Sequence, residues 1–248
     1  MFGFLKRKKL NPIFGALGVD VHSHLIPCVD DGSKGMDETL QCLRTMQDLG
    51  FKKTYITPHF QYPRFPNEES DIQRRFEEVK SAVQEQGLEI ELAGVGGEYR
   101  VDDGFAKRIE DARFLTIGDN YLLLELSLHQ PRLGFEDVVL DLMDKGYEVV
   151  LAHPERYPYF GPRSSQVERM KENGLLFQVN ILSLNGFYGD HAKRKAFSYL
   201  ERNWVEFLGT DLHNMSYAQA MIEASNNRKI QKVLETKRFL NSKMETKI

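Results

Sequence analysis

Short apolar runs alternate with helical segments along almost the whole chain, and this alternation limits the fold more than any other feature of the sequence. Runs such as YLLLELS and EVVLAH are apolar on both faces, which is typical of parallel strands covered by helices. An α/β fold with parallel strands is therefore predicted, either as a barrel or as an open doubly wound sheet. The expected strands are residues 18–24, 53–60, 90–99, 121–127, 148–153, 175–184 and 205–213.

The segments between the expected strands have the 3.6-residue apolar spacing or the polarity of surface helices. Gly50, Gly87, Gly146 and Gly174 follow four of these segments, at the position where a helix commonly ends in a left-handed residue. A chain of 248 residues, 41% of them hydrophobic, is ordinary for one α/β barrel, so a single domain is expected. The expected helices are residues 36–49, 68–86, 104–112, 135–145, 164–173, 191–203 and 217–235.

The two ends of the chain differ in composition from the part between them. A basic cluster, Lys6 with Arg7, Lys8 and Lys9, lies near the N-terminus, and no apolar segment of signal-peptide length follows it. We interpret residues 1–17 as a solvated extension that makes at most weak contact with an anionic membrane surface. The folded domain is predicted over residues 18–240, and the polar residues 241–248 are expected to be a disordered tail.

Composition also limits the partners and the location of the protein. The formal net charge of −3 provides no global basic field, so nucleic acid is not an expected partner. Only two cysteines occur, Cys28 and Cys42, and no apolar stretch approaches the roughly 18 residues of a membrane span. A cytoplasmic protein is therefore predicted, and the sequence leaves open whether it forms an oligomer.

Every expected strand except the sixth ends in residues that can bind a metal, in the motifs VDVHSH, ITPH, GGE, LLLE, LAH and GTDLH. The carboxyl ends of parallel strands meet at one edge of an α/β fold, so residues that are far apart in the chain converge there. Five of the seven histidines lie in these motifs. The residues expected to converge are His22, His24, His59, Glu98, Glu125, His153, Asp211 and His213.

A single histidine at a strand end is more often a hydrogen-bonded core residue than a metal ligand, but the set as a whole favours ligation. His22 and His24 lie two residues apart, so both rings project from one face of a strand, and Asp211 and His213 repeat that spacing. Buried imidazoles and carboxylates without a cation would cost several kcal/mol per ion. Nitrogen and oxygen ligands in this number suit two or three manganese, iron or zinc ions that share a carboxylate.

The ordered motifs VDVHSHLIPCVDDGS, TPHF, GGEY, LLELS, LAHPERY and GTDLHN resemble those of the polymerase and histidinol phosphatase (PHP) superfamily. Within it, the chain most resembles the bacterial manganese-dependent tyrosine phosphatases encoded beside capsule and exopolysaccharide genes. The resemblance covers residues 18–214 and implies a distorted seven-stranded (β/α)7 barrel of the TIM-like type with Mn²⁺ as cofactor. It also implies a phosphotyrosine protein as partner, namely the tail of a membrane-associated tyrosine kinase that controls polysaccharide export.

The resemblance further implies three ions and a set of ligands for each. Of the adjacent pair Asp30 and Asp31, it selects Asp31, which spacing alone could not do. Arg156, Asp211 and His213 are the predicted catalytic residues. The implied ligand sets are His22, His24, Glu98 and Asp211 for the first ion, Glu98, Glu125 and His153 for the second, and Asp31, His59 and His213 for the third.

Arg156 lies three residues after His153, and its planar guanidinium suits bidentate binding of a phosphate. The alternative is that it pairs with Glu155 or with a helix end. Two positions depart from the family pattern: Met-Ser-Tyr follows Asn214 where relatives carry an arginine, and Cys28 replaces the usual glycine of the first loop. Carboxylates follow Cys28, which disfavours a thiolate nucleophile, so we interpret it as a packing residue.

The predicted function is a metal-dependent phosphomonoesterase, foremost a protein tyrosine phosphatase. A histidinol-phosphate phosphatase, with the same metal cage and a small alkyl phosphate as substrate, is the first alternative. A nucleic-acid phosphoesterase is disfavoured because the sequence offers no basic groove. A non-catalytic metal-binding module that docks a kinase is the third, and the completeness of the ligand set argues against it.

The aromatic stretches HFQYPRF and ERYPYF follow the second and fifth expected strands, where loops border the site. Their rings, Phe60 and Tyr157 among them, either stack on an aromatic substrate or pack the loops, and the sequence leaves both interpretations open. His129 and His191 lie outside the ligand set and are expected in a surface loop and at a helix start.

Overall fold

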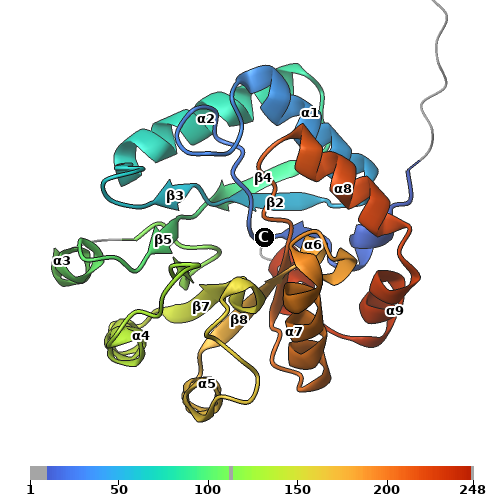
Figure 1. Cartoon of the computed structure of the whole chain (residues 1–248). Coiled ribbons are helices and arrows are strands. Elements are labelled where there is room, and N and C mark those ends of the chain that lie inside the picture. Colours follow the sequence, from blue (N-terminus) through green and yellow to red (C-terminus); the bar gives the residue numbers. More distant parts are fainter. Residues whose placement is uncertain (1–9, 112–113, 247–248) are drawn as a thin grey trace, which may run out of the picture.

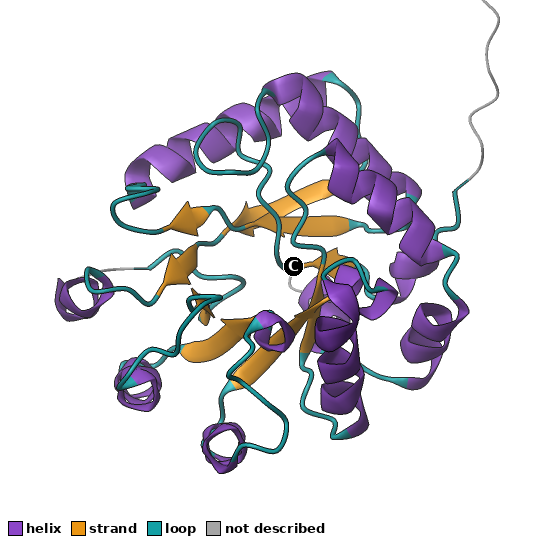
Figure 2. Ribbon diagram, viewed as in Figure 1, coloured by secondary structure: helices purple, strands orange, loops and turns teal. Residues whose placement is uncertain are grey.

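The computed structural model describes residues 10–111 and 114–246. In this part of the chain, nine short strands form two parallel sheets, and the helices lie outside them (Figures 1 and 2). The order is β1-β2-β4 in one sheet and β3-β5-β6-β7-β8-β9 in the other, so the predicted α/β fold with parallel strands is confirmed. The strands are β1 (Val19–Asp20), β2 (Lys53–Ile56), β3 (His59–Phe60), β4 (Glu91–Val95), β5 (Glu98–Arg100), β6 (Tyr121–Glu125), β7 (Glu148–Ala152), β8 (Leu176–Asn180) and β9 (Phe207–Gly209).

Two of the expected strands are broken, and each contributes to both sheets. Residues 53–60 form β2 and β3, and residues 90–99 form β4 and β5. At the second break, a Cβ atom on Gly97 would lie 2.6 Å from the ring of Tyr99. Only glycine therefore fits where the chain passes from the first sheet to the second.

The first and last strands lie side by side, although neither sheet contains both. The backbone N–H of Asp211 donates to the carbonyl of His22, and that of His24 donates to the carbonyl of Leu212, each at 2.8 Å. Ser23 and Leu212 form a parallel bridge between these hydrogen bonds. The backbone itself thus places the HSH and DLH motifs next to each other.

The strands direct alternate side chains into two apolar layers. In β6, Leu122 and Leu124 belong to the larger cluster, which packs against the helices, whereas Leu123 belongs to a smaller one. Members of the smaller cluster precede the predicted ligands along their strands, so this cluster supports the site from beneath. It consists of Val19, Val21, Ile117, Leu123, Val150, Ala152 and Phe207, with Leu240 and Met244 packed against it.

Amphipathic spacing explains the covering helices. In α2, Ile72, Phe76, Val79 and Val83 recur every three or four residues and are buried. The α-helices are α1 (Met36–Asp48), α2 (Glu69–Glu85), α3 (Phe105–Asp111), α4 (Phe135–Asp144), α5 (Ser165–Glu172), α6 (Ile181–Asn185), α7 (Gly189–Glu201), α8 (Met215–Ser225) and α9 (Arg228–Thr236); the 3-10 helices are η1 (Ile13–Ala16), η2 (Pro154–Arg156) and η3 (Leu240–Thr246).

Two expected elements are divided in the structure. Residues 175–184, expected as one strand, form β8 and then α6. The side chains of both are buried, and an apolar run does not distinguish a buried strand from a buried helix. Residues 217–235, expected within one helix, form parts of α8 and α9, because the side chain of Asn227 accepts from the N–H of Lys229 and caps the second helix.

Both ends of the described chain are more tightly packed than the sequence indicated. Phe14 and Leu17, within the expected extension, are buried, and the ring of Phe14 stacks on that of Phe51 at 5.4 Å between centroids. The basic cluster of residues 6–9 lies outside the described residues. At the other end, residues 241–246 belong to η3, and Asn241 is fully buried. The expectation of a solvated extension is therefore wrong for Phe14 and Leu17, and that of a disordered tail is wrong for residues 241–246.

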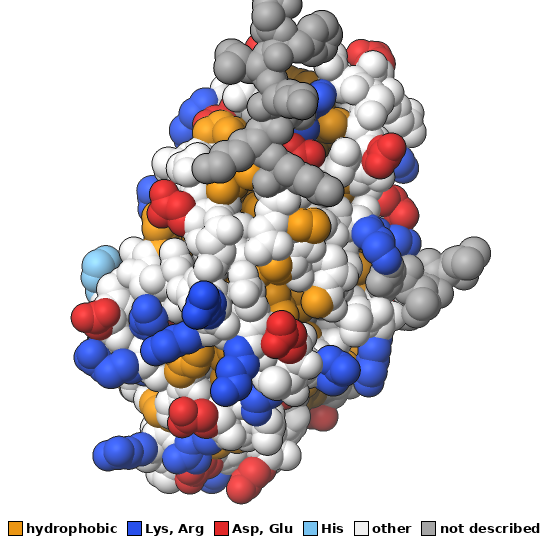
Figure 3. All heavy atoms as spheres, turned by 90° about the vertical axis from the view of Figure 1, so that its right-hand side faces the viewer, with side chains coloured by type: hydrophobic (Ala, Val, Ile, Leu, Met, Phe, Trp, Pro, Cys, Tyr) orange, Lys and Arg blue, Asp and Glu red, His pale blue; other side chains and the backbone are white. Residues whose placement is uncertain are grey.

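The surface over α8 and α9 mixes the two signs of charge. Figure 3 shows Lys and Arg side chains close to Asp and Glu side chains on this face, with apolar side chains between them. Among residues 10–111 and 114–246, no helix is long and apolar enough to cross a membrane.

The side chain of Asn241 connects β1 with β9 through hydrogen bonds to the backbone of both strands. Its Oδ1 accepts from the N–H of Leu208 at 3.0 Å, and its Nδ2 donates to the carbonyls of Leu208 and Val19 at 2.7 and 2.9 Å. Asn241→Ala removes these bonds from buried backbone groups, so we expect the free energy of unfolding to fall by about 2–4 kcal/mol. Urea titration measures this loss, with Ser242→Ala as the control. A change no larger than that of the control would contradict the role of Asn241.

Candidate metal centre

The predicted ligands meet at one cavity, which the strand ends and the loops after them enclose. Its volume is about 240 Å³. His59 and Glu98 are register partners in β3 and β5. His22 and His24 are fully buried, and their Nε2 atoms lie 3.4 and 3.3 Å from Glu98 Oε2. The predicted ligands that border the cavity are Asp31, His59, Glu98, Glu125, His153, Asp211 and His213.

Four side chains converge in a first group. The Nε2 atoms of His22 and His24 lie 3.2 Å apart. Asp211 Oδ1 lies 3.5 Å from the first of these nitrogens and 3.4 Å from the second. His22, His24 and Asp211 thus form a group that could hold one ion, and Glu98 Oε2 approaches both of its histidine nitrogens.

Glu98 also belongs to a second group. His153 Nε2 lies 3.0 Å from Glu98 Oε1 and 3.8 Å from Glu125 Oε1. His59 Nδ1 lies 3.0 Å from Glu98 Oε2 and 3.7 Å from Glu125 Oε2. A carboxylate shared between two groups is what a bridge between two ions requires. The structure therefore places both His153 and His59 beside Glu125, whereas the resemblance implies only His153 there.

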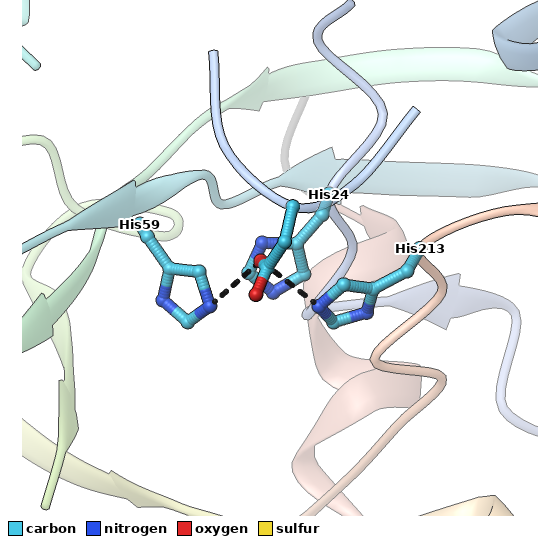
Figure 4. A group of neighbouring side chains, drawn as sticks. His24, His59 and His213 are labelled. Carbon is cyan, nitrogen blue, oxygen red and sulfur yellow. Dashed lines mark ion pairs between the residues drawn. The ribbon is translucent and has the colours of Figure 1, made fainter. Parts of the chain in front are cut away.

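His59 and His213 approach a third group from opposite sides, with His24 between them (Figure 4). Asp31 Oδ1 lies 3.4 Å from His59 Nε2 and 3.6 Å from His213 Nε2. His59 thus presents one ring nitrogen to the second group and the other to the third. Together these atoms could hold a further ion.

The adjacent aspartates, Asp30 and Asp31, have different surroundings. Asp30 is buried, and its Oδ2 lies 2.9 Å from His24 Nδ1 and accepts from the backbone N–H of His59 at 3.0 Å. A proton shared on Nδ1 leaves the Nε2 atom of His24 to face the first group. Asp31 is half exposed and borders the cavity. Asp30 is therefore a positioning residue, and Asp31 is the candidate ligand.

The sixth expected strand, which lacks a ligand motif, supplies the support for the first group. Gln178 Oε1 lies 2.7 Å from His22 Nδ1, and Gln178 Nε2 donates to Asn180 Oδ1 at 2.9 Å. Asn180 Nδ2 in turn donates to Asp211 Oδ2 at 2.6 Å. Neither residue was predicted from the sequence, where the available signal is two polar side chains at a period of two in the apolar run LFQVN.

Burial and neighbouring charges shift the protonation of the site. Burial opposes a charge on His22, but the carboxylates of Glu98 and Asp211 outweigh it and raise the pKa of this histidine. Burial and the charge of Glu98 raise the pKa of Glu125 to about 7. Burial and the charge of Arg156 lower the pKa of His153 to about 4. Binding of a cation would favour the deprotonated forms in which carboxylates and imidazoles act as ligands.

Several buried polar atoms of the predicted ligands have no hydrogen-bond partner within the described part of the chain. Each unpaired buried polar atom costs about 1–3 kcal/mol, and such atoms are uncommon in native proteins. Divalent cations bound by oxygen and nitrogen would satisfy these atoms, so the residues fit such ions. The atoms include Asp31 Oδ1, His59 Nδ1, Glu98 Oε2 and Glu125 Oε2.

The backbone is strained at two of the candidate ligands. His153 and Asp211 have positive φ angles of 36° and 52°, in the left-handed region that residues other than glycine rarely adopt. Such conformations cost about 1–3 kcal/mol and persist where the surrounding structure holds them, often at functional sites. At these two positions the chain turns out of β7 and β9 and directs the side chains toward the cavity.

Arg156 borders the cavity next to Asp211. Its Nη1 donates to Asp211 Oδ2 at 3.0 Å, and its guanidinium lies 4.4 Å above the ring of Tyr188. Tyr188 Oη donates to the same carboxylate oxygen at 3.3 Å. Glu155 accepts instead from the N–H of Asn180 at 3.0 Å. Arg156 therefore pairs with a site residue rather than with Glu155.

The remaining side chains that the sequence placed near the site differ in their exposure. Phe60 and Tyr157 are buried, so these two rings pack the core and are closed to a substrate. Cys28 is exposed, so its interpretation as a packing residue is wrong. Its φ angle of 61° explains why a glycine suits this position. His129 and His191 are exposed and lie outside the ligand groups.

These features define an α/β protein with a candidate metal centre at the carboxyl ends of its parallel strands. The family model described as "Capsular polysaccharide synthesis, CpsB/CapC" matches residues 18–244. The chain therefore belongs to the CpsB/CapC family of capsular polysaccharide synthesis.

Similar proteins span most of the chain. CapC of Staphylococcus aureus is 26% identical over 88% of this chain and 86% of its own length. Tyrosine-protein phosphatase YwqE of Bacillus subtilis (strain 168) is 26% identical over 79% of this chain and 78% of its own. Tyrosine-protein phosphatase CpsB of Streptococcus pneumoniae is 27% identical over 79% and 83%. A crystal structure from work on YwqE and CpsB, described as "unique metal-dependent tyrosine phosphatases", has the same fold, with a TM-score of 0.76 at 22% identity over 93% of this chain and 96% of that chain.

The support that Gln178 gives to His22 predicts an effect on metal affinity. Gln178→Leu removes the acceptor for His22 Nδ1, so the ring loses the bond that orients it toward the first group. We expect the affinity for Mn²⁺ to fall about 10–100-fold, as for other losses of a ligand's outer partner. Calorimetric titration of chelator-treated protein measures it, and Gln231→Leu, which changes a glutamine bonded to Ser225, is the matched control. Equal affinity in both variants would contradict this role.

Proposed function

We propose that this chain is a metal-dependent phosphomonoesterase that acts on phosphotyrosine in proteins. The observation that carries the proposal is the convergence of imidazoles and carboxylates on one cavity that Arg156 also borders. Cations and a guanidinium on one cavity suit an oxyanion such as a phosphate. The names of two family relatives, tyrosine-protein phosphatases YwqE and CpsB, support phosphotyrosine as the group that is hydrolysed.

The proposed cofactor is Mn²⁺, as two or three ions, with iron and zinc as the other candidates. The three groups of nearby ligand atoms support this number, and Glu98 lies within reach of two of them. Each proposed ligand is a buried or cavity-bordering side chain. The proposed sets are those that the family resemblance implies, and short distances between their members support them: His22, His24, Glu98 and Asp211; Glu98, Glu125 and His153; and Asp31, His59 and His213.

The side chains of this site have separate proposed tasks. When bound, the divalent ions would lower the pKa of water and neutralise phosphate charge. Arg156 binds phosphate oxygens through its planar fork, and Asp211 fixes the direction of that fork. The carbonyl of Asp211 faces Nδ1 of His213 at 2.8 Å, which leaves the Nε2 of that ring for the cavity. A phenol with a pKa of about 10 leaves more readily than an alkyl alcohol, so the reaction needs no dedicated acid.

Exposed aromatic side chains near the cavity support a protein substrate. Phe187 is 44% exposed and packs on Tyr217, which borders the cavity. Tyr62 is 72% exposed and lies in sequence between the cavity residues Gln61 and Arg64. Aromatic rings of this kind suit contact with a peptide. We propose the phosphorylated tail of a membrane-associated tyrosine kinase as the partner, since the family is one of capsular polysaccharide synthesis.

The finer description of the fold is also a proposal. Counting β2 with β3 and β4 with β5 as broken strands gives a distorted seven-stranded (β/α)7 barrel over residues 18–240, with the contact between the HSH and DLH motifs as its closure. The free thiols of Cys28 and Cys42 support a cytoplasmic location. Three expectations stay predictions: an oligomer, at most a weak membrane contact through the N-terminus, and the exclusion of nucleic acid.

Removal of two ligands tests the proposed chemistry. His22→Ala with His24→Ala deletes both imidazoles of the first group, and we expect turnover of an aryl phosphate with Mn²⁺ to fall by at least about 10³-fold, because more than one stabilising interaction with the transition state is lost. Initial rates measure this, with His129→Ala as the control on an exposed histidine. Turnover equal to that of the wild type in the double variant would contradict the proposed metal-dependent hydrolysis.

The wild-type protein in the same assays distinguishes substrates. The proposed function requires kcat/KM on phosphotyrosine peptides to exceed that on phosphoserine peptides and histidinol phosphate. A preference for histidinol phosphate would replace the tyrosine phosphatase with the small-molecule alternative. Bound metal without hydrolysis of any phosphoester would indicate a docking module.

Chelation gives a further test. Treatment with a chelator should abolish hydrolysis, and added manganese should restore it better than magnesium, because imidazole ligands favour the softer ion. Elemental analysis before and after treatment connects the activity to the metal content. Full activity in metal-free protein would exclude the proposed metal dependence.

A further inference from the structure

A second arginine, Arg100, borders the cavity beside Glu125. Arg100 ends β5, Glu125 ends β6, and the two residues are register partners in adjacent parallel strands. The side chain of Arg100 is 16% exposed. Its position is therefore set by the sheet rather than by a surface loop.

The contacts of Arg100 fix the position of its guanidinium but leave one of its N–H groups without a hydrogen bond. Nη1 donates to the carbonyl of Leu126, which keeps the group against the end of β6. Nε lies 3.2 Å from Glu125 Oε2, yet neither atom has a hydrogen-bond partner among the described residues. A buried N–H of a guanidinium that makes no hydrogen bond is costly unless an anion reaches it.

The carboxylate that balances the charge of Arg100 belongs to Glu125, which is also a proposed metal ligand. Glu125 is a proposed ligand, and its charge would be shared with a cation. Arg100 would then face the cavity with donors to spare and without a full anionic partner. Arg156 differs, because it keeps its hydrogen bond to Asp211 Oδ2.

The two arginines lie on opposite sides of Glu125. β5 and β7 are the neighbours of β6 in the sheet, Arg100 ends β5, and Arg156 follows β7. An anion in the cavity can thus be contacted from both sides. Arg64, which also borders the cavity, is a weaker candidate, since its side chain is 62% exposed and pairs with Asp31 at the surface.

We propose that Arg100 is a second phosphate-binding residue, which holds the phosphoryl group of the substrate from the side opposite Arg156. The proposal rests on the proposed function only in requiring that a phosphate enters this cavity. Nitrogen donors of a planar guanidinium suit two oxygens of one phosphate, and a lysine would supply the charge without the fork.

Binding of orthophosphate to the manganese-loaded protein tests the proposal without any turnover. Arg100→Gln should weaken this binding about 10–100-fold, since hydrogen bonds from a charged donor are lost. Arg100→Lys should give an intermediate affinity, because it keeps the charge. Arg108→Gln is the matched control: Arg108 is also partly buried and pairs with Glu69, away from the cavity. Calorimetry measures the affinities, and the KM of each variant for an aryl phosphate should rise in the same order.

Metal content and thermal midpoint, measured on the same samples, separate binding from positioning. An unchanged phosphate affinity in Arg100→Gln overturns the proposal. An affinity that falls only with lost manganese and returns with excess manganese also overturns it, because Arg100 would then act through Glu125. If the Gln variant does not fold, the Lys variant decides, and phosphate affinity equal to that of the wild type rejects the idea. Orthophosphate binding by a wild type that hydrolyses no phosphotyrosine would sink the proposed function alone.

Discussion

The whole structure depends on how buried carboxylates and imidazoles coexist at the carboxyl ends of parallel strands. Glu98 contacts His22, His24, His59 and His153 within 3.4 Å, away from solvent. Such a cluster is stable only when opposite charges compensate one another, because water cannot do so there. Cations would remove the conflict, and four of the unpaired atoms belong to residues of the candidate metal groups, namely Asp31, His59, Glu98 and Glu125. The fold therefore carries a cost that metal binding would offset.

The remainder of the chain supports that cluster. An apolar layer beneath it includes Leu123 and Val150, which precede site residues along β6 and β7. Asp30 and Gln178 hold the outer nitrogens of His24 and His22, so each ring presents its Nε2 inward. Hydrogen bonds between the first and last strands fix the distance between two ligand motifs that lie almost 190 residues apart in the chain. The order of the strands therefore determines which ligand motifs lie next to each other.

Much of this arrangement could be predicted from the sequence, because periodicity and strand-end motifs are local features. Parallel strands bring their carboxyl ends together whatever the loops do, so the convergence of the strand-end histidines and carboxylates could be predicted from motif positions. Features that depend on packing were missed. Apolarity did not reveal that Phe60 and Tyr157 are core residues, that α6 follows β8, or that Cys28 is exposed. Arg100 and Gln178 carry no motif at all.

By itself, the sequence determined the α/β class, the family and the residue types that gather at one edge, since hydrophobic spacing and ligand chemistry are properties of the chain. Only the tertiary structure decided which ring nitrogen of each histidine faces inward and which arginines flank Glu125. These choices depend on side-chain direction within a few ångströms. That direction follows from strand register and packing between segments distant in the chain, which no local pattern encodes.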